Sequence, residues 1–244
     1  MRLEISALAG LPEIRPGDDL AALIRASAAL ENQPIEGPVL IAVAQKVVSK
    51  AEGAVVDLRQ VEPSAMAYAW AAQSNRDARL VELILRQSRR IVKMDRGLLI
   101  CETQHGLVCA NAGVDQSNVA GDDFATVLPA DPDASARRLR SMLGCGAVII
   151  TDTFGRPWRE GLVDVAIGVS GLEGLEDYRG STDRHGRKLG STIIAIADQL
   201  AAAAGLLMRK ADGCPVVFVR GMVWQQAEGS ARALIRPREQ DLFR

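Results

Sequence analysis

The stretch GAVIITDTFGRPWREG, residues 146–161, decides how this chain folds and where its polar chemistry lies. Its first half is an apolar run with the length of a buried strand, and Asp152 and Thr153 follow where that strand should end. Sheets with parallel strands bind ligands beyond the carboxyl ends of those strands, so these two residues are expected to face a crevice. Gly155 permits a sharp turn, and Arg156 offers a guanidinium group to phosphate or carboxylate oxygens. The structural alternative is an aspartate that caps a turn beside solvated arginines.

Other apolar runs of strand length lie along the chain, with amphipathic or Ala- and Leu-rich stretches between them. The predicted strands, besides residues 146–153, are residues 2–8, 39–46, 98–103, 107–113, 162–171 and 215–221. The predicted helices are residues 18–30, 64–90, 131–143 and 191–210. Residues 168–190 are rich in glycine and charge, so we expect a long functional loop there. Strands and helices do not alternate regularly enough for a doubly wound sheet.

Composition restricts the classes of partner. The 244 residues are 48% hydrophobic, which is enough for a sizeable core. Lys and Arg number 29 against 30 Asp and Glu, so there is no basic excess for nucleic acid or an anionic membrane. We find no signal-like segment and no apolar span of membrane length, and we expect a cytoplasmic protein. Four dispersed cysteines without a CxxC pair predict reduced, buried thiols, and two histidines are too few for a histidine-rich metal site.

A second acidic segment, ANAGVDQSN (residues 110–118), also follows an apolar run and carries Asp115, Ser117 and Asn118. A Mg²⁺ or Mn²⁺ ion bound to a nucleotide takes only a few protein oxygens, because phosphates and waters supply the rest. Two aspartates at the ends of different strands, Asp115 and Asp152, suit that arrangement. An Asx-turn in a glycine-containing loop is the alternative for Asp115.

A third segment, AQKVVSKAEG (residues 44–53), places Lys46 and Lys50 just past the apolar run VLIAVAQ (residues 39–45) of a predicted strand. Lysine binds nucleotide phosphates as a point charge, although ordinary solvated lysines explain the spacing equally well. The chain contains no GxxxxGK[ST] and no glycine-rich dinucleotide motif after a first strand, so any nucleotide binds by another fold. Near the C-terminus, Gln226 and Glu228 follow another predicted strand, and a surface turn is an equally good interpretation there.

Together these segments resemble the coenzyme F420-0:L-glutamate ligases, which add glutamate to a deazaflavin redox cofactor. The resemblance extends from near residue 38 to past residue 220, with AGLPEI (residues 9–14) as an N-terminal match. The matching stretches are AQKVVSKAEG, ETQHGLVCANAGVDQSNV, LPADPDASARRLR, VIITDTFGRPWREGLVDVAIGVSGL, DYRGSTDRHGRKLGSTIIAIADQLAAAAGLLMRK and PVVFVRG. The chain resembles the stand-alone form of the enzyme, without the flavin-binding reductase-like domain of some relatives.

The resemblance implies a GTP-dependent amide ligase that requires Mg²⁺ or Mn²⁺, with potassium assisting in some members. The implied metal ligands are Asp115, Asp152, Thr153 and, as first choice in the C-terminal segment, Gln226. The implied GTP contacts are Gly10, Leu11, Pro12, Glu13, Gln45, Lys46, Lys50, Asn118, Gln226, Glu228 and Gly229. The residues expected to act in catalysis are Asp152, Lys50 and Arg156.

The expected mechanism transfers a phosphoryl group from GTP to a carboxylate of the coenzyme precursor, and the amine of L-glutamate then attacks the acyl phosphate. The anionic precursor requires a positively lined pocket, for which the candidates are Arg156, Arg159, Arg179, Arg184 and Arg187. The resemblance also implies a homodimer and an α+β fold, which is neither P-loop nor Rossmann, as a single ligase domain over residues 1–244 with two closely associated subdomains. A metal-dependent phosphohydrolase and a catalytically silent nucleotide-binding module remain the alternatives.

Overall fold

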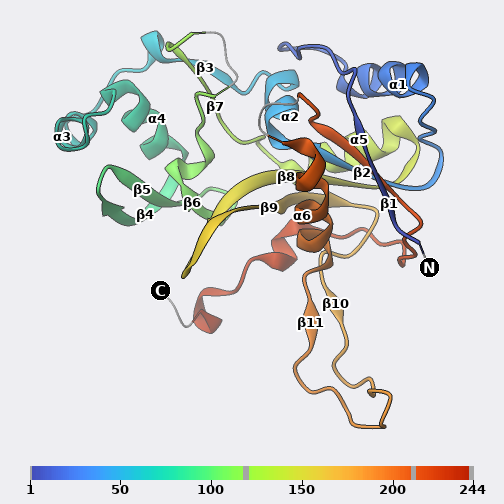
Figure 1. The fold of residues 1–244 in the computed structure, drawn as a ribbon. Helices are drawn as coiled ribbons and strands as arrows, with labels where there is room; N and C mark the ends of the chain where they lie inside the picture. Colours follow the sequence, from blue (N-terminus) through green and yellow to red (C-terminus); the bar gives the residue numbers. More distant parts are fainter. Residues whose placement is uncertain (1, 118–120, 210–212, 242–244) are drawn as a thin grey trace.

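A computed structural model describes residues 2–117, 121–209 and 213–241, and its centre is a five-stranded mixed sheet (Figure 1). The strand order is β1 (Glu4–Leu8), β12 (Val216–Arg220), β2 (Gly37–Ala44), β8 (Cys145–Arg156) and β9 (Arg159–Ser170). Only β2 and β8 are parallel neighbours; the other pairs are antiparallel. Each of these strands lies on an apolar run that predicts it, and the α+β class is confirmed.

Helices cover both faces of this sheet, which explains its continuous apolar runs. One face carries α1 (Leu20–Leu30), α2 (Gln45–Ala51) and α5 (Pro132–Leu143), and the other carries α6 (Ile196–Met208). Side chains alternate between the faces along β8: Val148 and Ile150 pack with the first group, whereas Ala147 and Ile149 pack with α6. The same alternation places Asp152 on the face of α2 and Thr153 on the face of α6.

Residues 55–126 form a second lobe beside the sheet, with a separate hydrophobic cluster (Figure 1). The lobe contains β3 (Val55–Asp57), α3 (Ala65–Ser74), α4 (Ala78–Gln87), β4 (Ser88–Asp95), β5 (Leu98–Thr103), β6 (Val108–Ala110) and β7 (Phe124–Thr126). Strands β3 and β7 pair, and β4, β5 and β6 form a three-stranded sheet. The chain enters and leaves the lobe at one point, because the Val127 amide donates to the Ala54 carbonyl at 3.0 Å. The division of the chain into domains stays a prediction.

The prediction of one helix over residues 64–90 is wrong. Helix α3 ends at Ser74, and Asn75 adopts the left-handed conformation with φ 52° as its C-cap. Asp77 then caps a new helix by accepting a hydrogen bond from the Arg79 amide, and α4 ends at Gln87 because Ser88 begins a strand. An asparagine and an aspartate therefore interrupt a stretch whose composition favours a helix throughout.

Several element ends also differ from expectation. The second strand ends at Ala44, so Lys46 and Lys50 belong to a helix. The run at residues 107–113 contains only a short strand, followed by the 3-10 turn Asn111–Gly113, in which Ala112 has φ 52°. Helix α6 begins at Ile196 because the preceding β11 (Ile193–Ile194) pairs with β10 (Glu176–Asp177). Most of the predicted functional loop therefore forms a two-stranded arm that projects from the sheet (Figure 1), and its function stays a prediction.

A buried carboxylate fixes the C-terminal segment to the sheet. Asp133 of α5 accepts hydrogen bonds from the amides of Val169 and Ala231 at 2.8 and 2.9 Å, and from the Ser230 hydroxyl. Short 3-10 turns follow at Ala231–Leu234 and Arg238–Gln240. Cys101, Cys109 and Cys145 are buried thiols. In the parts of the chain that the structure describes, no helix has the length and apolarity of a membrane span.

Candidate functional site

The predicted polar residues gather where β2 ends beside the middle of β8. Asp152 and Thr153 do not end that strand as expected, because β8 continues past them to Arg156 in a hairpin with β9. Ala44 pairs with Thr151 in parallel register, and helix α2 begins with the next residue, Gln45. Lys46, in the first turn of α2, therefore starts beside Asp152. Strand β6 of the second lobe also contacts β8, so both parts of the molecule meet here.

Asp115 forms the centre of this site. Its Oδ2 lies 2.7 Å from the Lys46 ammonium and accepts a hydrogen bond of 2.9 Å from the Ser117 hydroxyl, while Oδ1 accepts from the Ser117 amide at 2.7 Å. The Asp115 main chain exchanges two hydrogen bonds with Thr126, which fixes its position on the lobe. Burial raises the pKa of Asp115, but the hydrogen bonds from Lys46 and Ser117 outweigh it and the net pKa is lowered. The carboxylate is therefore charged at neutral pH.

Asp152 lies close to the second lobe. Its Oδ1 accepts a hydrogen bond of 2.9 Å from the Thr153 amide. Burial, followed by the negative charge of Asp152, raises the pKa of the Cys109 thiol on β6 to about 12. The negative charge of Asp152 therefore acts at Cys109, which lies six residues before Asp115 in the chain.

A second lysine on the same helix binds the N-terminal segment. The Lys50 ammonium, on a side chain only 9% exposed, lies 2.5 Å from Glu13 Oε1. The preceding turn is held by α1, because the Gly10 amide donates to Glu31 at 2.7 Å and the Ser27 hydroxyl donates to the Gly10 carbonyl at 3.0 Å. Leu11 and Pro12 lie between these anchors. Helix α2 thus presents two ammonium groups, one turn apart, to carboxylates from different parts of the chain.

Three of the predicted residues have their side chains engaged elsewhere. The Thr153 hydroxyl donates to Asp164 at 2.5 Å on the opposite face of β8 from Asp152. Gln45 is buried and accepts a hydrogen bond of 2.7 Å from Ser49 in its own helix. Arg156 donates to main-chain carbonyls at the end of the β8–β9 hairpin, four residues, or about 13 Å of strand, beyond Asp152.

The predicted C-terminal ligands lie near the other end of β8. Arg140 of α5 donates to the Gly146 carbonyl at 3.0 Å, and to Gln226 and Glu228 at 2.9 and 3.2 Å. Gly146 and Asp152 are six residues apart on one strand, which corresponds to about 20 Å. Gly229 packs so closely on the Leu172 carbonyl that a Cβ would lie 1.9 Å from that oxygen. Asn118 lies outside the described residues.

Sequence reasoning did not find the residues that support the site. Glu31 and Ser27 hold the turn at Gly10 from a helix that follows it, and no local pattern indicates such a contact. Asp164 carries one signal, because an acid interrupts an apolar strand at that position. Its partner across the sheet, Thr153, depends on the pairing register.

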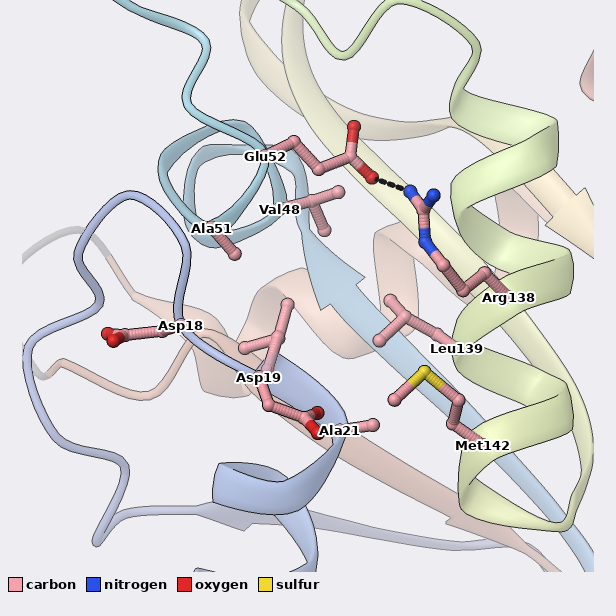
Figure 2. Close-up of a pocket in the computed structure, with 10 residues that line it drawn as sticks. Asp18, Asp19, Ala21, Val48, Ala51, Glu52, Arg138, Leu139 and Met142 are labelled. Carbon is pink, nitrogen blue, oxygen red and sulfur yellow. Dashed lines mark hydrogen bonds and ion pairs between the residues drawn. The ribbon is translucent and has the colours of Figure 1, made fainter.

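A cavity of about 500 Å³ lies behind α2 rather than at Asp115 (Figure 2). It opens between α1, α2 and α5, and its lining includes Asp18, Asp19, Val48, Glu52, Arg138 and Met142. Val48 and Glu52 lie on the opposite side of α2 from Lys46 and Lys50, as the helical period of 3.6 residues requires. The Arg138 guanidinium pairs with Glu52 across this cavity. The charged contacts of Lys46 and Lys50 therefore lie outside this cavity.

Comparison with known proteins identifies the family. The model of the F420-0:Gamma-glutamyl ligase family matches residues 10–221. A curated protein of Methanopyrus kandleri, named Coenzyme F420:L-glutamate ligase, is 51% identical over 95% of this chain and 94% of its own. Proteins with the same name from Methanothermobacter thermautotrophicus and Methanocaldococcus jannaschii are 43% identical over 100% of both chains and 41% identical over 96% and 94%.

The matched region contains the segments that converge at α2. The Gly10 turn begins it, and α2, the Asp115 segment and the end of β8 all lie within it. The extent of the match, together with relatives that are more than 40% identical over nearly their whole length, decides the assignment. The chain belongs to the F420-0:gamma-glutamyl ligase family.

Proposed function

We propose that this chain joins L-glutamate to the precursor of the deazaflavin coenzyme F420 in a GTP-dependent reaction at the site around α2. The relatives named Coenzyme F420:L-glutamate ligase support the substrates of this proposal. The observation that carries the proposed nucleotide dependence is the pairing of two lysines of one helix with carboxylates, Lys46 with Asp115 and Lys50 with Glu13, beside Asp152. Ammonium groups next to carboxylates suit a triphosphate and its divalent cation.

The side chains at this site fit Mg²⁺ or Mn²⁺. A nucleotide-bound ion of this kind takes one or two carboxylates and receives its other oxygens from phosphates and waters. In the described residues, no three His, Cys, Asp or Glu side chains form a self-sufficient metal cluster, which agrees with a ligand set completed by substrate. Asp115 and Asp152 would hold the ion, and its charge would neutralise the phosphate oxygens.

The two lysines are proposed to exchange partners when nucleotide binds. Lys46 now neutralises Asp115, and Lys50 now neutralises Glu13. Phosphate oxygens compete for the same ammonium groups, and release of Lys46 leaves the Asp115 carboxylate to the divalent ion. Metal and nucleotide should therefore bind together more tightly than either binds alone.

The proposed reaction has two steps. A carboxylate oxygen of the precursor attacks the γ-phosphorus of GTP, the bond to the β-phosphate oxygen breaks, and an acyl phosphate and GDP form. The glutamate nitrogen, once deprotonated, attacks the acyl carbon, and inorganic phosphate leaves with the electron pair of the broken C–O bond. Lys50 is proposed to stabilise the transferred phosphoryl group. Arg156 keeps its predicted role only if the hairpin that carries it moves toward the site or reaches the site of another copy.

Mass spectrometry of the reaction products tests this proposal. The full chain is incubated with the glutamate-free coenzyme precursor, L-glutamate and Mn²⁺, with GTP in one tube and ATP in another. Successive increments of one glutamyl residue that require GTP support the ligase. Phosphate release without a glutamyl increment indicates the phosphohydrolase, and the absence of both indicates a silent nucleotide-binding module. The homodimer and the cytoplasmic location remain predictions.

A further inference from the structure

Hydrogen bonds join the two halves of the segment that carries Asp115, residues 115–117 and 122–126. At its base, Asp115 and Thr126 form an antiparallel bridge with main-chain hydrogen bonds of 3.0 and 2.8 Å. Above the base, the Gln116 side chain donates to the Asp122 carbonyl at 2.9 Å. These contacts link residues 115–117, the descending part of the segment, to residues 122–126, the ascending part. A displacement of one part is therefore transmitted to the other.

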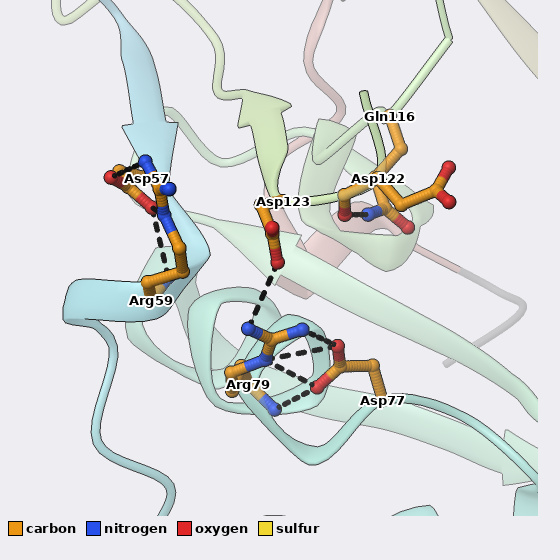
Figure 3. Close-up of polar contacts among 7 residues, drawn as sticks. All are labelled: Asp57, Arg59, Asp77, Arg79, Gln116, Asp122 and Asp123. Carbon is orange, nitrogen blue, oxygen red and sulfur yellow. Dashed lines mark hydrogen bonds and ion pairs between the residues drawn. The ribbon is translucent and has the colours of Figure 1, made fainter. Parts of the chain in front are cut away.

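One arginine connects the ascending part to another element. Arg79, in the first turn of α4, donates to the Asp123 carboxylate at 3.1 Å (Figure 3). The Leu58 amide donates to the Asp123 carbonyl at 2.8 Å, and Phe124 and Thr126 of β7 follow. Thr126, whose main chain pairs with Asp115, therefore lies three residues after Asp123, whose side chain Arg79 holds.

The Arg79 guanidinium is itself oriented by Asp77. Arg79 Nη2 lies 2.6 Å from Asp77 Oδ2, and Nε lies 3.1 and 3.0 Å from the two carboxylate oxygens. Asp77 also accepts the Arg79 amide at 2.8 Å as the cap of α4. With Nε and Nη2 held in this fork, Nη1 points to Asp123 (Figure 3). Two ordered carboxylates on one guanidinium give a fixed geometry, which a flexible lysine would reproduce only in part.

A neighbouring arginine provides a matched comparison. Arg59 makes the same fork with Asp57, at 2.9 Å from Nε and 2.7 Å from Nη2, and its guanidinium lies 5.5 Å from the centre of the Phe124 ring. In the described part of the chain, the hydrogen bonds of Arg59 stay with Asp57. Both arginines are on the surface of the same lobe, but of the two only Arg79 donates a hydrogen bond to a side chain of the Asp115 segment (Figure 3), whereas Arg59 contacts that segment through the Phe124 ring.

We propose that Arg79 is a positioning residue of the metal and nucleotide site, and that it acts on Asp115 through Asp123 and the Asp115–Thr126 bridge. The inference rests on the proposed function of Asp115 as a metal ligand. The side chains of Arg79 and Asp77 are 34% and 35% exposed, and ion pairs of this exposure contribute little to global stability. The hydrophobic cluster of the lobe holds the fold, and the arginine sets the position of one carboxylate within it.

Mn²⁺ binding in the presence of GDP tests the inference. Free Mn²⁺ is followed by electron paramagnetic resonance in the full chain and in the variants Arg79→Gln, Arg79→Lys and Arg59→Gln. We expect Arg79→Gln to weaken Mn²⁺ binding about tenfold, the lower end of the effect of residues that orient metal ligands. Arg79→Lys should recover part of this loss, and Arg59→Gln should stay within about twofold of the unaltered chain because it leaves the Asp123 bond intact.

Two further variants separate the possible causes. Asp123→Asn weakens the same contact from the other side and should reproduce the loss, even if Arg79→Gln fails to fold. Asp115→Asn removes the proposed ligand itself. Loss of binding in Asp115→Asn, together with equal affinities in Arg79→Gln and Arg59→Gln, overturns the role of Arg79 alone. Absence of Mn²⁺ binding by the unaltered chain, or unchanged binding in Asp115→Asn, overturns the proposed metal site and the inference with it.

Discussion

Replacement of Lys46 by Met should change the binding of metal and of nucleotide in opposite directions. In the structure, the Lys46 ammonium lies 2.7 Å from Asp115 Oδ2 and occupies the carboxylate that the divalent ion would need. Met keeps most of the volume of the side chain and removes its charge. Mn²⁺ alone should then bind Asp115 more tightly, whereas the Mn²⁺ complex of GDP should bind more weakly because a phosphate contact is lost.

The contact geometry gives the size of both effects. A hydrogen bond between charged groups contributes about 1.5–3 kcal/mol. The Asp115 side chain is 42% exposed, so solvent screening favours the lower end of that range. About 1.4 kcal/mol corresponds to a factor of about ten in a dissociation constant. We therefore expect Mn²⁺ alone to bind about tenfold more tightly to Lys46→Met, and the GDP complex about tenfold more weakly.

Two titrations measure this pair of effects. Electron paramagnetic resonance reports free Mn²⁺ without nucleotide, and calorimetry reports GDP binding at saturating Mn²⁺. Lys93→Met is the control, because the Lys93 side chain is 68% exposed and pairs with Asp95, at 3.7 Å, instead of with a carboxylate of the site. A fall of both affinities in Lys46→Met, or no change in either, would refute the exchange of partners proposed for this lysine.

Three further predictions concern single carboxylates. Asp152→Asn should reduce glutamyl transfer at least about 100-fold with an unchanged circular dichroism spectrum, because it removes a charged metal ligand but no core side chain; turnover near normal would contradict its assignment. Asp133→Ala leaves two buried amides without their acceptor and should lower the free energy of unfolding in urea by about 3 kcal/mol, with a smaller loss in Ser230→Ala. The hydrogen bonds from Arg79 lower the pKa of Asp77 below 3.8, so this carboxylate stabilises the fold above that pH and loses its contribution as the pH falls through its folded pKa. In Arg79→Gln, the stability lost between about pH 5 and the acid limit should therefore be smaller than in the unaltered chain. Urea midpoints that depend on pH in the same way in both chains would argue against an effect of the Asp77–Arg79 ion pair on stability.

The strands of the central sheet could be predicted because burial on both faces produces apolar runs that few other structures require. The contact between Asp115 and Lys46 could be predicted only in part. Both segments follow apolar strands, but Lys46 lies in the first turn of α2 and Asp115 follows a 3-10 turn, and these elements bring the two side chains together. The interruption at Asn75 could not be predicted, because the stretch around it favours a helix and one residue in the left-handed conformation decides the boundary. The short strands β3 and β7 contain only three residues each, too few for a periodic signal.

Two side chains that were predicted at the site, those of Thr153 and Gln226, make their contacts elsewhere, and for different reasons. The face of Thr153 follows from alternation along β8, and the sequence contains that information. The position of Gln226 does not follow from any local pattern, because it depends on Arg140, which lies 86 residues earlier in the chain. Contacts of this range are fixed only when the sheet and α5 have assembled.

The joining of the second lobe at Ala54 and Val127 has a consequence for protein engineering. Because the Val127–Ala54 hydrogen bond and the pairing of β3 with β7 hold the two ends of residues 55–126 together, this stretch is a cassette whose removal leaves no gap to bridge. A cassette exchanged between relatives would bring its own Asp115 and Arg79 to the lysines of the host's α2. Chimeric chains built at these two residues would therefore show whether metal preference follows Asp115 of the cassette or Asp152 of its host.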